Sequence, residues 1–115
     1  MVASRFPDGR DAGDIAMTTF NVVRFRIKPG REEEFLAAHR GGNAAWPGLA
    51  EGHMIRTGER AYCLIGRWRD AEALKSARPE MIATLNSFRD TLEDLGDGRG
   101  VTDAASGESV VDLLR

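Results

Sequence analysis

The chain has 115 residues, of which 42% are hydrophobic and 30% are charged, as is ordinary for a single globular domain. Its formal net charge of −2 excludes a general electrostatic attraction to nucleic acid or to anionic membranes, and we expect neither as a partner. The single cysteine, Cys63, excludes an internal disulfide framework. It predicts a buried, inert thiol and a cytoplasmic protein.

Residues 1–17 show no helical or strand periodicity and are rich in glycine, aspartate and arginine. This composition is typical of a disordered terminal tail. Met17 directly precedes the first periodic segment, so translation from Met17 is an alternative interpretation of the same pattern. Residues 18–115 are predicted to form one domain.

Residues 18–27 alternate as a strand does, with Asn21, Val23, Phe25 and Ile27 on one face. A helix is predicted to follow, with Gly30 as its N-cap, three glutamates in its first turn and an inward stripe that includes His39. The glycines at positions 41 and 42 are expected to bend or end that helix.

Residues 53–68 form two apolar runs around a short polar segment, which predicts a β-hairpin with Gly58 at positive φ. Asp70 is a suitable N-cap for a short helix from residue 71. Pro79 is predicted to begin a separate helix, because a missing N–H group is tolerated in the first turn. The apolar stripe of this second helix is Met81, Leu85, Phe88, Leu92 and Leu95.

A polar loop is predicted to reach about residue 107, and a last strand is predicted over residues 109–114, where four apolar side chains lie. The resulting order, β-α-β-β-α-β, indicates an α+β, ferredoxin-like domain with a four-stranded antiparallel sheet.

Three segments resemble the antibiotic biosynthesis monooxygenase-like family: residues 22–35, the Pro-Gly pair at positions 47 and 48, and residues 67–74. The resemblance covers roughly residues 19–114 and implies a homodimeric α/β barrel, in which two four-stranded sheets pack face to face. It implies a cofactor-independent monooxygenase that acts on a small aromatic or polyketide-like substrate, and we expect no cofactor. The alternative is a non-catalytic, dimeric small-ligand-binding or stress-associated protein of the same fold.

Some relatives degrade haem with an asparagine on the first strand and a tryptophan and a histidine in the later helical region. Here Val23 occupies the position of that asparagine, and residues 71–95 contain neither tryptophan nor histidine. Haem chemistry of that type is therefore not expected. The two histidines, His39 and His53, lie 14 residues apart without an acidic ligand pattern, so no metal site is predicted either.

The candidate catalytic residues are Asn21, as a hydrogen-bond donor to a developing enolate, and His39, as a base for a phenolic substrate. Asn21 bonded to neighbouring backbone and His39 bonded to a helix carbonyl are the structural alternatives. Trp46 and Tyr62 are candidates for the wall of a substrate pocket, or for the core. Trp68 is assigned to the core.

Strand alternation places four arginines on the face of the sheet away from the helices: Arg24, Arg26, Arg67 and Arg69. In a dimer this face would be covered by a second sheet, and the arginines would need carboxylate partners. The candidates are Glu51, Glu108 and Asp112 of either chain. An anionic ligand on this face is the alternative.

Overall fold

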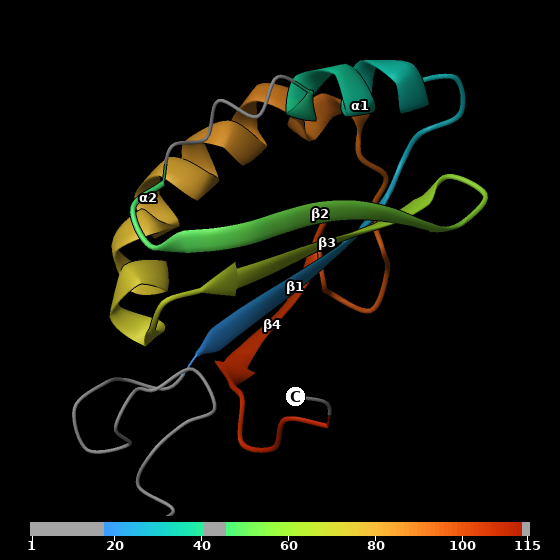
Figure 1. The fold of residues 1–115 in the computed structure, drawn as a ribbon. Coiled ribbons are helices and arrows are strands. Elements are labelled where there is room, and N and C mark those ends of the chain that lie inside the picture. Colours follow the sequence, from blue (N-terminus) through green and yellow to red (C-terminus); the bar gives the residue numbers. More distant parts are fainter. Residues whose placement is uncertain (1–17, 41–45, 114–115) are drawn as a thin grey trace, which may run out of the picture.

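The computed structural model describes residues 18–40 and 46–113, and the predicted tail at residues 1–17 and the glycines at positions 41 and 42 lie outside these ranges. The elements are β1 (Thr19–Arg26), α1 (Glu32–His39), β2 (Leu49–Gly58), β3 (Ala61–Trp68), α2 (Ala71–Phe88), a 3₁₀ turn η1 (Arg89–Thr91) and β4 (Asp103–Glu108). The predicted ferredoxin-like order and four-stranded antiparallel sheet are therefore confirmed (Figure 1). In the described ranges no helix is both long and apolar enough to cross a membrane.

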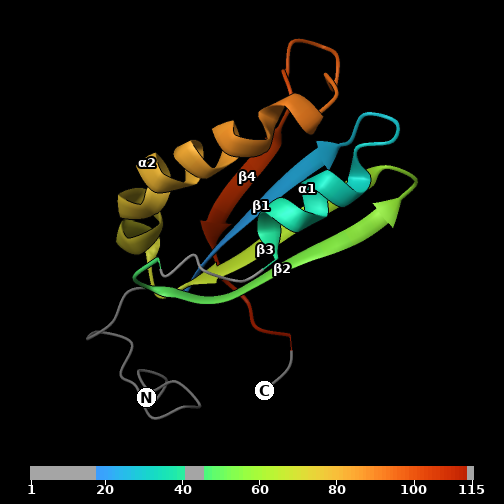
Figure 2. The same cartoon turned by 90° about the horizontal axis from the view of Figure 1, so that it is seen from above.

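The strands are ordered β2-β3-β1-β4, and every neighbouring pair is antiparallel. Both helices lie over the same face of this sheet (Figures 1 and 2). Asn21 and Phe25 on the inner strand β1, and Ile27 directly after it, face the helices, and all three are buried. In the register, Asn21 faces Gly66 on β3 and Ser106 on β4.

Two separate apolar clusters join the helices to the sheet. The first is built around Phe25, Phe35, Phe88 and Leu92, and it lies under α1 and the end of α2. The second is built around Trp68, against which Ala73, Leu74 and Ala77 from the first two turns of α2 pack. Because the clusters are separate, the middle of the helix–sheet interface is left to the residues between them, Asn21 among these.

The helices begin and end elsewhere than predicted. Arg31 rather than Gly30 is the N-cap of α1, and Gly30 has a φ of 78°, so it belongs to the preceding turn. Asp70 caps α2 as predicted, since its carboxylate accepts a hydrogen bond of 2.8 Å from the Ala73 amide. The predicted break at Pro79 is wrong, because α2 runs through it without interruption.

The helix after Pro79 also ends before the predicted apolar stripe does. The helix ends at Phe88, and Leu92 is buried instead through an isolated antiparallel bridge to Ile27. The amide of Glu93 donates to Arg26, so this segment runs beside the end of β1.

The last strand and the hairpin turn differ as well. The predicted strand at residues 109–114 is wrong as far as the structure describes it, because β4 lies at Asp103–Glu108 and Val110 and Leu113 are exposed. In the hairpin, the positive φ falls on Arg60, at 55°, and not on Gly58. The Arg60 guanidinium donates to the Ile27 carbonyl at 2.7 Å and pairs with Glu93, which holds this backbone conformation from outside the turn.

Candidate functional site

A cavity of about 860 Å³ lies between the sheet and the two helices. Most of its wall is apolar, and it draws on both apolar clusters, with Val23 and Phe88 from the first and Leu74 and Met81 from the second. Its polar side chains are few: Asn21 on β1, His39 on α1, Arg78 and Thr84 on α2, Ser106 on β4, and His53 and Thr102. A large apolar cavity with a few polar groups is typical of a site for a small molecule.

Asn21 is held in one orientation by the core. Its Oδ1 atom accepts a hydrogen bond of 2.8 Å from the indole Nε1–H of Trp68, and both side chains are buried. An indole nitrogen can only donate, so the amide oxygen must face Trp68 and the amide NH₂ must face away from it. The NH₂ group has no hydrogen-bond partner among the described residues, and no described side-chain nitrogen or oxygen that lacks a partner is fully buried. The NH₂ group is therefore accessible, and because Asn21 lines the cavity it is a donor at the cavity wall.

Gly66 makes this hydrogen bond sterically possible. A Cβ atom at position 66 would overlap with the Asn21 Oδ1 atom and would crowd Trp68 Nε1. The predicted alternative of an Asn21 bonded to neighbouring backbone therefore gives way to a side-chain pair, and Trp68 is the core residue that the sequence predicts.

His39 lines the same cavity from the last turn of α1. Its Nδ1 atom lies 2.8 Å from the carbonyl oxygen of Phe35, which can only accept, so this ring nitrogen carries the hydrogen. In the neutral imidazole the Nε2 atom is then the proton acceptor. The ring packs against Phe35 and Phe88, with centroids 4.7 and 4.4 Å away. His39 therefore makes the helix-carbonyl bond of the structural alternative and still has its Nε2 atom available as a base.

Trp46 also lines the cavity, and its ring stacks on that of Trp68 with centroids 6.1 Å apart and planes 14° apart. The stack ties the cavity wall to the residue that orients Asn21. Three of the four candidate site residues, Asn21, His39 and Trp46, are therefore brought to one cavity.

Tyr62 is not among the residues that line the cavity. Its ring is buried against Phe35, and its hydroxyl donates to Glu32 on α1 at 2.7 Å. This hydrogen bond, with a smaller effect of burial, raises the pKa of the Tyr62 hydroxyl. The side chain fastens α1 to the sheet.

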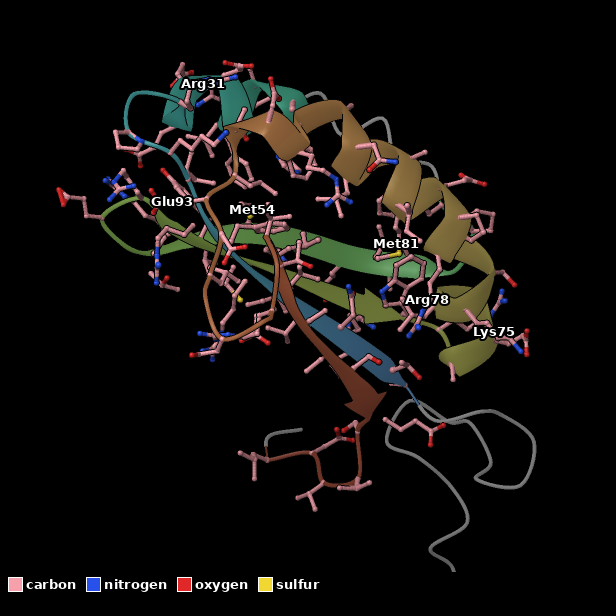
Figure 3. The ribbon with its side chains drawn as sticks, turned by 180° about the vertical axis from the view of Figure 1, so that it is seen from behind. Arg31, Met54, Lys75, Arg78, Met81 and Glu93 are labelled. Carbon is pink, nitrogen blue, oxygen red and sulfur yellow. The ribbon has the colours of Figure 1, made fainter. Side chains whose placement is uncertain are left out.

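Arg78 and Ser106 line the cavity, although the sequence did not predict either as a site residue. Arg78 on α2 reaches Ser106 on β4, with 3.5 Å between its Nη2 atom and the serine hydroxyl oxygen. Figure 3 shows Arg78 and Met81 on the side of α2 that faces the sheet. Arg78 stands beside Pro79 in the predicted break, and Ser106 lies in the predicted loop, so neither was placed in a regular element. The helical spacing of Leu74, Ala77 and Met81 was the signal that could have placed α2 correctly.

No family model matches the sequence, and no curated protein is similar to it at a significant level. Solved structures do match. SnoaB, a cofactor-independent oxygenase from Streptomyces nogalater, is 19% identical over 87% of this chain and 100% of its own, with a TM-score of 0.63. A protein from Chloroflexus aurantiacus J-10-fl, provisionally described as an antibiotic biosynthesis monooxygenase, is 14% identical over 83% and 95% of the two chains, with a TM-score of 0.62.

A heme-degrading protein from Mycobacterium tuberculosis is 20% identical over 87% of this chain and 99% of its own, with a TM-score of 0.54. The predicted resemblance to antibiotic biosynthesis monooxygenase-like proteins is confirmed at the level of the fold. Since these structures have at most 20% identity to the chain, they establish its architecture, and the activity has to be argued from the cavity.

Proposed function

We propose that this protein is a cofactor-independent monooxygenase that oxidises a small, electron-rich aromatic or polyketide-like substrate in the cavity between sheet and helices. The observation that carries the proposal is the orientation of Asn21, whose amide NH₂ group is directed to the cavity by the hydrogen bond of its oxygen to Trp68. A fixed donor in an apolar cavity stabilises negative charge that develops on a substrate oxygen.

His39 is the proposed base. With its Nδ1–H bonded to Phe35, the Nε2 atom takes a proton from an acidic C–H or phenolic O–H group of the substrate. For an activated methylene group, the carbanion then adds O₂ to form a C–O bond, and protonation gives a hydroperoxide. Loss of water leaves a ketone, so one CH₂ group and one O₂ become one C=O group and one water.

Two features of the site and one of the comparisons support this chemistry. Trp46, stacked on Trp68, offers a flat apolar wall for an aromatic ring. The solved structures that share the fold include a cofactor-independent oxygenase. The mostly apolar lining of the cavity lowers the polarity around a reactive carbanion.

The alternative is a non-catalytic protein that binds a small ligand in the same cavity. One observation favours it: no described carboxylate bonds to His39, so the proposed base has no acidic partner to stabilise its protonated form.

Oxygen consumption with a panel of hydroquinones and anthrones distinguishes the two functions. Asn21→Asp keeps an oxygen that accepts from Trp68 but replaces the donor at the cavity wall with a second acceptor. We expect this variant and His39→Ala each to lose most of the activity while the near-ultraviolet circular dichroism stays unchanged. Lys75→Ala, on the outer side of α2, is the control. Oxygen consumption that is absent from the unaltered protein, or equal in all variants, would establish the binding function instead.

We also propose that the protein is a homodimer that packs through the sheet face opposite the helices. Val22 and Ile65 are cross-strand neighbours on this face, and Ile55, on β2, is 42% exposed. Of the four predicted arginines, Arg67 bonds to Glu51 of its own chain at 2.7 Å. Arg24 and Arg26 have no ion pair with any described residue, which leaves them available to carboxylates of a second copy.

A further inference from the structure

The cavity has a marked charge asymmetry. Arg78 is the only lysine or arginine among the described residues that line it, and no aspartate or glutamate is among them. Arg78 is exposed, so its guanidinium lies at the edge of the cavity, where no carboxylate of the described lining neutralises it.

Most of the other described arginines have a carboxylate partner. In the described part of the chain, carboxylates pair with the seven arginines Arg31, Arg40, Arg56, Arg60, Arg67, Arg69 and Arg99. Arg24, Arg26, Arg78 and Arg89 have no such pair with a described residue. Of these four only Arg78 lines the cavity, and its hydrogen bond is a long one, 3.5 Å, to the neutral hydroxyl of Ser106. The long distance leaves most of its five N–H donors available to another acceptor.

Other donors gather at the same end of the cavity. Ser106 on β4 lies directly opposite Asn21 on β1 in the register, and both side chains face the helices. The guanidinium of Arg78, the hydroxyl of Ser106 and the amide NH₂ of Asn21 therefore belong to one region. Met81, one turn after Arg78 on the inner side of α2, begins the apolar wall beside them (Figure 3).

We propose that Arg78 is a specificity-determining residue that binds a carboxylate on an otherwise apolar, aromatic substrate. The planar guanidinium matches the two oxygens of a carboxylate, and Ser106 supplies a further donor at its side. A single cation with neutral donors beside it suits a monoanion better than a phosphate ester, which carries nearly two charges. The aromatic body of the ligand then extends over the apolar wall.

This inference rests on the proposed function, since it assigns a substrate class to the same cavity. It places the carboxylate on Arg78 and Ser106, and the Asn21 amide beside them and His39 then act on the ring system. It also separates binding from chemistry, because Arg78 takes part in no proton transfer.

The test compares two probes with the same ring system, 2-naphthoate and 2-naphthamide, in binding titrations by calorimetry under nitrogen, where no turnover occurs. We expect the unaltered protein to bind the carboxylate about tenfold more tightly than the amide, as for a charge-assisted hydrogen bond. Arg78→Gln should lose that preference by weakening only the carboxylate. Lys75→Ala, which removes a cation from the outer side of the same helix, should keep it (Figure 3).

Equal affinities in the unaltered protein, no measurable binding of 2-naphthoate, or a preference that survives Arg78→Gln would each overturn the inference. The two proposals fail separately. Arg78-dependent binding without oxygen consumption on any substrate would refute the oxygenase and keep the carboxylate site. Oxygen consumption without a carboxylate preference would do the reverse.

Discussion

The indole Nε1–H of Trp68 donates to the Oδ1 atom of Asn21 across the β1–β3 pair, with 2.8 Å between the two atoms. The two residues are 47 positions apart in the chain, and the bond is buried. It converts a core tryptophan into the group that decides which end of the asparagine amide faces the cavity. Packing and site geometry thus depend on the same contact.

Gly66 is the residue on which this contact depends most directly. In Gly66→Ala the new methyl group would overlap with Asn21 Oδ1, and we expect a loss of about 1–3 kcal/mol in the free energy of unfolding, as for an overpacked core. Urea denaturation measures it. Gly52→Ala is the matched control, because Gly52 is the β2 residue paired with Gly66. A Cβ atom at position 52 would have its nearest neighbour, a Leu49 side-chain atom, at an ordinary contact distance of 3.8 Å. Equal losses in the free energy of unfolding for the two variants would show that the Asn21–Trp68 contact tolerates an added methyl group.

Tyr62 predicts a dependence of stability on alkaline pH. Its pKa is raised by the hydrogen bond to Glu32, so the folded state keeps the hydroxyl proton at pH values where the unfolded chain has lost it. The stabilisation is therefore complete below about pH 10, the unfolded value, and is lost as pH rises through the folded-state pKa.

Urea denaturation of the unaltered protein and of Tyr62→Phe between pH 8 and pH 11 measures this effect. Tyr62 is the only tyrosine in the chain, and the substitution leaves every other titrating group in place. The unaltered protein should be the more stable of the two at pH 8, and the difference should shrink toward pH 11. A difference that is constant over the whole range would contradict the assignment.

Phe88 connects the apolar core to the candidate base. Its ring is buried, and its centroid lies 4.4 Å from that of His39 and 5.9 Å from that of Phe25. Phe88→Ala should cost about 3–5 kcal/mol in the free energy of unfolding through lost contacts and the enlarged cavity. Ile82→Ala, on the same helix at a position that is 55% exposed, should cost less than about 1 kcal/mol. Comparable costs at the two positions would place the core elsewhere.

The parts of this fold that follow from the sequence are those in which burial sets a pattern. Along β1 and the residue after it, alternation predicts that Asn21, Phe25 and Ile27 face the helices, and each is buried there. The strand β4 has no such pattern: Ala104 and Ser106 border a cavity instead of filling a core, so their small side chains read as a loop.

The errors at the turn and in the second helix have a common cause, because local preferences were outweighed by distant contacts. Arg60 holds a positive φ through bonds to Ile27 and Glu93, about thirty residues away in both directions. Pro79 lacks one backbone donor, but α2 is anchored on both sides of it, by Ala77 against Trp68 and by Phe88 in the other cluster. The site shows the same limit, since the partner of Asn21 is Trp68, which the sequence could assign only to the core.

The last prediction concerns the sheet face that carries no helix in the described part of the chain (Figure 1). Val22 and Ile65 lie opposite one another at its centre, on the strands β1 and β3, and only partly buried. Apolar side chains at the middle of an uncovered sheet favour packing against a second copy. We therefore expect the unaltered protein to scatter light as a dimer at micromolar concentration, and a stable monomer would refute the proposed assembly.

Val22→Arg tests the same face more sharply. Two-fold packing would bury two unpaired guanidinium groups, and leaving a buried charge without a partner costs about 3–5 kcal/mol. The dimer should weaken more than a hundredfold and become a monomer in the same measurement. The chain itself should still fold, because the side chain at position 22 points away from both helices. Ile82→Arg puts the same charge on an exposed apolar position of α2 and should leave the dimer intact. Dissociation by Ile82→Arg together with an intact Val22→Arg dimer would move the interface from the sheet to the helices.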